Sequence, residues 1–188
     1  MDLQLKGKKA LVMGASSGIG RAIAEALVQE GATVAICARS IEKLKKTAQE
    51  IGCQYYFTAD LTKVGEAKLA VEKCYSEMRG LDILVTNTGG PQKGNFLDVS
   101  AEQWAEDFQS LWMSVVESLK VALPRMKENN FGRIIFITSL AAKEPLLGLT
   151  TSNGLRAGLA GLAKSISNEF SPYGITLNLL LPGYTNTE

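Results

Sequence analysis

A glycine-rich segment, GASSGIG at positions 14–20, holds the first residues whose types and spacing suit a particular chemistry. Gly14, Gly18 and Gly20 lack a Cβ atom, so backbone N–H groups beside them can approach a pyrophosphate closely. The positive end of a helix dipole would attract the same group. For the glycine spacing alone, an ordinary glycine-rich loop is the alternative. The position between a strand-like run and a helical one predicts a dinucleotide site, which also includes Ser16, Ser17 and Ile19.

The residues Ala38, Arg39 and Ser40 follow the second strand-like run, where a dinucleotide site contacts the adenosine ribose. An acidic side chain at this place would accept hydrogen bonds from the ribose hydroxyls and would repel a 2′-phosphate. A guanidinium can instead bind a 2′-phosphate through two hydrogen bonds. Arg39 therefore indicates NADP(H) as the cofactor, and a solvated loop arginine is the alternative.

The composition argues against several other kinds of site. The 188-residue chain has no histidine, which removes histidine-dependent nucleophilic sets and histidine-ligated metal sites. Its 20 basic and 19 acidic residues give a net charge of +1, without the basic excess typical of nucleic-acid binding. The three cysteines form no CxxC pair, and an odd number is a poor disulfide framework. We expect buried free thiols, no metal site and no nucleic-acid partner.

The first residues, MDLQLKGKK, contain no apolar core of signal-peptide length. No apolar run approaches the roughly 18 residues that a membrane span needs. These observations predict a cytoplasmic protein without a membrane partner.

Strand-like and helical segments alternate along the chain. Strands are expected at 9–13, 33–38, 54–58, 82–86, 133–138 and 175–180. Helices are expected from about 19 to 31, and at 41–50, 62–79, 101–127 and 152–170. Near-continuous apolar strands that alternate with helices predict an α/β fold, a Rossmann-type doubly wound parallel sheet with helices on both faces. Without a linker or repeat, residues 1–188 are expected to form one dinucleotide-binding domain that includes the catalytic region.

Together these motifs resemble the short-chain dehydrogenase/reductase family, and most closely its 3-oxoacyl-acyl-carrier-protein reductase-like group. The ordered motifs are GASSGIG at 14–20, NTGG at 87–90, a strand that ends in Ser139, and PG followed by a threonine at 182–187. The resemblance covers essentially the whole chain. It implies an oxidoreductase that transfers a hydride between NADP(H) and a small carbonyl or alcohol substrate, with 3-oxoacyl compounds as one candidate class.

The resemblance also implies roles for residues outside the glycine segment. Asp60 and Leu61 would lie at the adenine, and Asn87 and Gly89 beside the cofactor. Pro182, Gly183 and Thr187 would lie near the nicotinamide carboxamide. Asn87, Gly89, Pro182 and Gly183 are also ordinary turn-forming residues, which is the alternative interpretation.

The catalytic residues of the family, an Asn-Ser-Tyr-Lys set, match this chain only at the serine, Ser139. Leu111 aligns with the asparagine, and the YxxxK signature becomes Ser152-Asn-Gly-Leu-Arg156. A tyrosine phenol has a pKa of about 10 that a nearby cation can lower, whereas a serine hydroxyl is a much weaker acid. Arg156 can contact ribose hydroxyls or stabilise an oxyanion, but it does not lose its proton.

The candidate catalytic residues are therefore Ser139, Ser152 and Arg156, with an atypical proton relay. A bound water and Tyr184 are other candidate proton donors. Ser152 can alternatively be the N-cap of the helix it begins, and Ser139 a satisfied hydroxyl at a strand end.

Replacement of the tyrosine, lysine and asparagine also supports another class of function, a non-catalytic NADP(H)-binding regulatory or scaffold protein. The resemblance implies a homodimer or homotetramer formed through the helices expected at 101–127 and 152–170. It also places a substrate lid and a seventh strand after position 188. We therefore expect six strands of the sheet here, without the C-terminal strand and lid, in a chain that is truncated or continues in a further tail.

Overall fold

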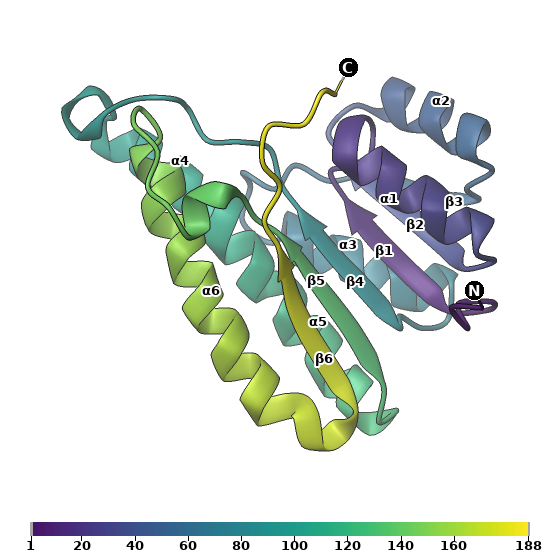
Figure 1. Ribbon diagram of the computed structural model, residues 1–188. Coiled ribbons are helices and arrows are strands. Elements are labelled where there is room, and N and C mark those ends of the chain that lie inside the picture. The colour runs from purple at the N-terminus through teal and green to yellow at the C-terminus, as the bar shows by residue number, and fades with distance from the viewer. Residues whose placement is uncertain (1, 188) are drawn as a thin grey trace.

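Six parallel strands form one sheet in the computed structural model, which describes residues 2–187 (Figure 1). The strands are β1 (Lys9–Met13), β2 (Thr33–Ala38), β3 (Tyr55–Thr58), β4 (Ile83–Asn87), β5 (Gly132–Ile137) and β6 (Ile175–Leu180). Their order across the sheet is β3-β2-β1-β4-β5-β6, and every neighbouring pair is parallel. This is the strand order of a Rossmann-type sheet, so the predicted fold class is confirmed.

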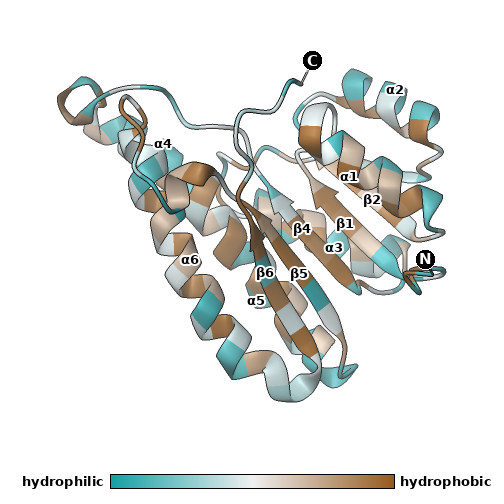
Figure 2. Cartoon of the chain, viewed as in Figure 1, coloured by the Kyte–Doolittle hydropathy of each residue, from teal (hydrophilic) through white to brown (hydrophobic). Residues whose placement is uncertain are grey.

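Helices cover both faces of the sheet, which explains why the strands are apolar almost throughout. Successive side chains of a strand point to opposite faces. Leu11 and Met13 accordingly pack in one buried cluster with residues of α3 (Glu66–Glu77), α5 (Ser114–Glu128) and α6 (Thr150–Phe170). Ala10 and Val12 pack in a second cluster with residues of α1 (Gly18–Gln29) and α2 (Ile41–Ile51). Figure 2 shows the apolar strands and the more polar outer surface of α2.

Two expected helices begin elsewhere in the structure. The helix expected from 62 begins at Glu66, because Thr62 is held in a turn by Asp60 Oδ1 and Gly65 precedes the helix with a φ of +85°. The helix expected from 152 begins at Thr150, because the loop carbonyl of Gly94 accepts the Thr150 N–H at 3.3 Å. Ser152 is therefore inside the first turn of α6, and its interpretation as an N-cap is wrong.

The helix expected at 101–127 consists of three parts. α4 (Ala101–Phe108) and α5 are joined by a π-helical turn, η2 (Gln109–Met113). Within this region Ser114 Oγ donates to the Ser110 carbonyl, and Ser118 Oγ donates to the Ser114 carbonyl at 2.6 Å. Hydroxyls that bond back to the preceding turn are known to bend helices.

Three short 3-10 helices complete the described elements: η1 (Phe96–Asp98), η3 (Leu140–Ala142) and η4 (Ser171–Tyr173). No helix within residues 2–187 has the length and apolarity that would let it span a membrane.

Candidate functional site

Two adjoining cavities open at the carboxyl ends of the strands, with volumes of about 670 and 320 Å³. Ile19, Asn87, Thr88 and Gly90 line both of them. Each strand contributes a lining residue at or just after its end: Gly14, Arg39, Asp60, Asn87, Ser139 and Pro182, in the order β1 to β6. Open α/β sheets bind ligands at this edge, so the two cavities are the candidate site.

The turn between β1 and α1 is built to receive an anion. Gly14 and Gly18 have φ values of +59° and +57°, which favour glycine. Ser17 precedes α1 without capping it through its side chain, and the first turn of α1 contains no acidic residue. The first N–H groups of the helix are therefore free of a capping side chain and point, with the helix dipole, toward the cavity end.

Close packing against β4 fixes the position of this turn. Asn87 Nδ2 donates to the Gly14 carbonyl at 3.2 Å. A Cβ atom on Gly20 would lie 2.4 Å from the Gly14 oxygen and 2.7 Å from Asn87 Nδ2. Neither backbone nor side chain has room for that atom, so glycine is required at position 20.

Replacing Gly20 by alanine should therefore destabilise the fold by about 1–3 kcal/mol, the usual cost of overpacking. The matched control is Gly161→Ala, in the middle of α6, where a Cβ would meet no atom within 4 Å. This change should stabilise the protein by up to about 1 kcal/mol, because alanine favours helix more than glycine does. Urea denaturation measures both. Equal midpoints for Gly20→Ala and the unmodified chain would contradict the packing described.

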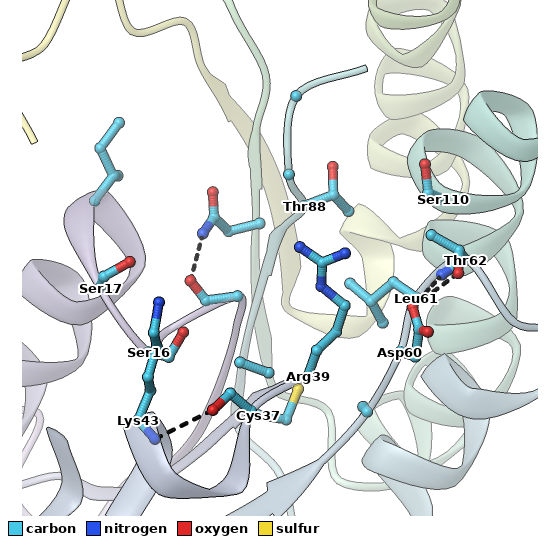
Figure 3. A pocket seen from close by; sticks show the side chains of 18 of the residues that line it. Ser16, Ser17, Cys37, Arg39, Lys43, Asp60, Leu61, Thr62, Thr88 and Ser110 are labelled. Atoms are coloured by element: carbon cyan, nitrogen blue, oxygen red, sulfur yellow. Dashed lines mark hydrogen bonds between the residues drawn. The ribbon is translucent and has the colours of Figure 1, made fainter. Parts of the chain in front are cut away.

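Two cations lie near the end of β2, one just after the strand and one in the first turn of α2. Arg39 and Lys43 are exposed, line the larger cavity, and form no ion pair within residues 2–187. The Ser40 hydroxyl accepts the Lys43 N–H at 3.4 Å and so caps α2. In Figure 3, Arg39 lies between Ser16, Ser17 and Lys43 on one side and Asp60, Leu61 and Thr62 on the other. A phosphate in this part of the cavity would meet two free cations.

Asp60 lies near Arg39, shortly after the end of β3 (Figure 3). Burial pushes the pKa of its carboxyl upward, but hydrogen bonds from Thr62 and the positive charges of Lys63 and Arg39 outweigh burial. The pKa of Asp60 therefore lies below its ordinary value. The carboxylate is ionised at neutral pH and can accept a hydrogen bond from a ligand.

Another wall of the larger cavity is formed by polar residues in and just after α4, which were not among the predicted site residues. Gln103, Asp107 and Ser110 line this wall with Glu106. Asp107 is 4% exposed; its Oδ1 accepts from Gln103 Nε2 at 3.0 Å, and its Oδ2 has no partner within the described residues. Their helical spacing in the sequence was the available signal.

The smaller cavity contains the three candidate catalytic residues. Ser139 follows β5, and its Oγ accepts the Ala141 N–H at 3.2 Å, so its own hydroxyl hydrogen is free to donate. Ser152 and Arg156 lie one turn apart on α6 and are 3% and 6% exposed. A carbonyl oxygen in this cavity would therefore meet two hydroxyls and a guanidinium.

Arg156 has few partners for a buried cation. Its Nη1 donates to the Ile137 carbonyl at 3.2 Å, while its Nε is buried with no partner within residues 2–187. Burial lowers the pKa of the guanidinium from its ordinary value. Arginine nevertheless keeps its charge in proteins, because its ordinary pKa is so high.

The structure brings together most of the predicted site residues. The larger cavity is lined by Gly14, Ser16, Ser17, Ile19, Arg39, Asp60, Leu61, Asn87, Gly89 and Thr187. The smaller is lined by Ile19, Asn87, Ser139, Ser152, Arg156, Pro182 and Gly183. Gly18 and Gly20 line neither and shape the turn instead; a Cβ on Gly18 would lie 3.3 Å from Thr187. Lys43 also lines the larger cavity but was not among the predicted site residues. The available signal was its position four residues after Arg39.

The residue that aligns with the family's asparagine, and one candidate proton donor, lie outside the two cavities. Leu111 is 1% exposed, packs in the core at the π-helical turn and lines neither cavity. Tyr184 is 100% exposed and also lines neither. No tyrosine within the described part of the chain lines either cavity.

The three cysteines are buried free thiols, as expected. Cys37 lines the floor of the larger cavity, and burial raises its pKa from 9.0 to about 12. Between these values the unfolded chain loses the thiol proton and the folded chain keeps it. The folded state then binds more protons, so stability should fall as pH rises from about 9 toward 12, by up to about 1.4 kcal/mol per pH unit.

Urea denaturation at several pH values measures this slope, and Cys37→Ala is the matched variant because it removes the titrating thiol. The slopes of stability against pH should differ between the two proteins only above pH 9. Parallel pH profiles would contradict the expected contribution of Cys37.

Comparison with known proteins identifies relatives over the whole chain. A family model described as short chain dehydrogenase matches residues 8–188. The uncharacterized oxidoreductase YvrD of Bacillus subtilis (strain 168) is 37% identical over 191 residues, which cover 100% of this chain and 72% of that protein. The 3-oxoacyl-acyl-carrier-protein reductase FabG of Aquifex aeolicus (strain VF5) is 33% identical over 193 residues, covering 100% of this chain and 78% of that protein.

Solved structures agree with these relatives. L-Sorbose reductase from Gluconobacter frateurii, complexed with NADPH and L-sorbose, superposes with a TM-score of 0.95 and is 30% identical. That match covers 100% of this chain and 73% of the other. An actinorhodin polyketide ketoreductase variant with NADPH gives a TM-score of 0.91 at 32% identity, covering 96% of this chain and 72% of the other.

Proposed function

The chain belongs to the short-chain dehydrogenase family, and from this premise we propose that it is an NADP(H)-dependent oxidoreductase acting on a carbonyl or alcohol. The observation that carries the proposal is the pair of free cations, Arg39 and Lys43, in the same cavity as the glycine turn. Structural relatives that contain NADPH support the choice of cofactor.

The residues present fit a dinucleotide phosphate. Close packing of Gly14 and Gly20 against Asn87 fixes the glycine turn at the edge of the larger cavity, and the helix end behind it favours an anion. In this proposal the turn from Gly14 to Gly20, with Ser16 and Ser17, binds the pyrophosphate. Arg39 and Lys43 bind the 2′-phosphate.

The remaining contacts follow the two cavities from the adenine end to the nicotinamide end. Asp60 and Leu61 lie at the adenine in this proposal. Asn87 lines both cavities, and Gly89 lies nearby in the larger one. The nicotinamide carboxamide is bound by Pro182, Gly183 and Thr187. Arg156 reaches the nearby ribose.

The bound nicotinamide supplies or accepts the hydride. The protein orients the substrate oxygen through the Ser139 hydroxyl, whose hydrogen is free because Oγ already accepts from Ala141. Arg156 stabilises negative charge that develops on this oxygen. Ser152, one helical turn away, donates the proton and regains one from solvent in the cavity. This relay replaces the absent phenol with a weaker acid, so we expect slower turnover than a tyrosine would give.

The alternative is a non-catalytic NADP(H)-binding protein that regulates or scaffolds a partner. The absence of a tyrosine among the described residues that line the two cavities, and the burial of Leu111, favour it. Such regulation requires that the partner bind the cofactor-bound and free states differently.

Two measurements on the full chain separate these functions. Titration with NADPH and NADH tests cofactor binding, and NADPH oxidation with a panel of ketones and 3-oxoacyl thioesters tests turnover. The proposal expects NADPH to bind more tightly than NADH and to be oxidised faster when a carbonyl compound is present. Tight NADPH binding without any carbonyl-dependent oxidation would support the regulatory alternative instead.

A further inference from the structure

The smaller cavity is positively charged. The only charged residues among its described lining are Arg156 and Lys93, and no acidic side chain lines it. Ser139, Ser152 and Thr138 add hydroxyl groups. Such a lining repels cationic ligands and favours ligands that carry negative charge.

Arg156 requires more hydrogen-bond partners than the protein gives it. The side chain is only 6% exposed, and buried arginines are almost always paired with an anion. Of the donors on its guanidinium, one contacts the Ile137 carbonyl, and Nε is buried without a partner. Arg156 takes part in no salt bridge within the described residues. Its planar fork matches a carboxylate through two parallel hydrogen bonds, which a lysine ammonium cannot reproduce.

The spacing of the lining residues limits where a carboxylate would be attached. Ser152 and Arg156 are four residues apart on α6, so their Cβ atoms lie about 5–6 Å apart on one face. Ser139 lines the same cavity. A carbonyl oxygen held by the two hydroxyls and a carboxylate held by Arg156 can therefore belong to the same small molecule.

We propose that the smaller cavity selects oxo acids: Ser139 and Ser152 bind the carbonyl oxygen, and Arg156 binds the carboxylate in place of its contacts with the ribose and the carbonyl oxygen. Lys93, exposed at the cavity, attracts the anion. In the reduction, the carbonyl carbon gains a hydride from the nicotinamide and the oxygen gains a proton from the Ser152 hydroxyl, which regains one from solvent. A hydroxy acid forms and the carboxylate is unchanged. This inference rests on the proposed function and specifies its substrate class.

Binding of a non-reducible oxo-acid mimic tests the carboxylate site without turnover. Oxamate and its neutral methyl ester are titrated calorimetrically into the chain alone and into the chain saturated with NADPH. Oxamate should bind at least about tenfold more tightly than the ester, because a hydrogen bond to a charged group is the stronger kind. Arg156→Gln should abolish this preference and Arg156→Lys should restore part of it. The control, Lys164→Gln, removes an exposed charge from the same helix and should change nothing.

Turnover by the unmodified chain gives a second test that does not depend on whether the Arg156 variants fold. The ratio of kcat/KM for acetoacetate to that for methyl acetoacetate should exceed about ten, and so should the ratio for pyruvate to methyl pyruvate. Equal binding of oxamate and its ester in both cofactor states, or equal kcat/KM for acid and ester, would overturn the inference. Failure of NADPH to bind would overturn the proposed function instead, while oxamate binding to the chain alone would still report on Arg156.

Discussion

An Arg39→Asp variant should bind NADPH about a hundredfold more weakly than the unmodified chain and should bind NADH more tightly. The change removes the guanidinium that we expect to bind the 2′-phosphate, and each hydrogen bond to a charged group contributes about 1.5–3 kcal/mol. Every 1.4 kcal/mol corresponds to a factor of ten in Kd. The new carboxylate also repels the 2′-phosphate, and it can accept hydrogen bonds from the free ribose hydroxyls of NADH.

Fluorescence titration with each cofactor measures this change. The control is Lys45→Asp, which makes the same change of charge at an exposed position of α2 that does not line either cavity. The Kd values of this control for both cofactors should stay within about twofold of those of the unmodified chain. Lys43→Gln should weaken NADPH binding less than Arg39→Asp does, because Lys43 offers a point charge rather than a fork. An unchanged preference in Arg39→Asp would show that Arg39 is a solvated loop residue.

A Ser139→Ala variant should lose about a hundredfold to a thousandfold in kcat, the usual cost of removing one donor to a developing oxyanion. NADPH binding should change by less than about twofold, because Ser139 lines only the smaller cavity. The substitution also removes the bond from the Ala141 N–H to Ser139 Oγ, which should cost about 1 kcal/mol of stability.

Ser100→Ala separates these two effects. Ser100 caps α4 by accepting the Gln103 N–H at 3.2 Å, the same distance as at Ser139, and it lines neither cavity. Its loss should lower stability by a similar amount and leave kcat unchanged. Steady-state rates and denaturation midpoints of the two variants distinguish a role of Ser139 in turnover from a role in stability alone. Equal rates for Ser139→Ala and the unmodified chain would exclude Ser139 as the group that orients the substrate.

Much of the fold could be predicted because the strands are nearly continuous apolar runs. Three expected strands, at 9–13, 33–38 and 175–180, have the same bounds in the structure. The ends of the helices were harder to predict, because contacts with residues distant in the sequence determine them. The Gly94 carbonyl, for example, receives the first N–H of α6. The π-helical turn at Gln109–Met113 was not predicted, because the apolar residues from Trp112 to Leu123 keep the spacing of an ordinary helix.

The site was predictable where chemistry depends on a strand end and its following turn. Arg39, Asp60 and Ser139 each follow a strand, and the parallel sheet brings them to one edge. Side chains that reach the cavities from helix faces were less predictable. Asp107 and Lys43 look like ordinary helix residues in the sequence, and only the fold turns them toward the larger cavity.

No tyrosine among the described residues lines either cavity, which makes turnover the central question for this protein. Incubation of the full chain with a carbonyl substrate and NADPH deuterated at the transferring position of the nicotinamide tests turnover most directly. Mass spectrometry then measures deuterium in the alcohol product. We expect one deuterium per alcohol molecule with the unmodified chain, and far less deuterated alcohol in the same time with Ser139→Ala. NADPH binding without deuterated alcohol from the unmodified chain would contradict the assignment as an oxidoreductase.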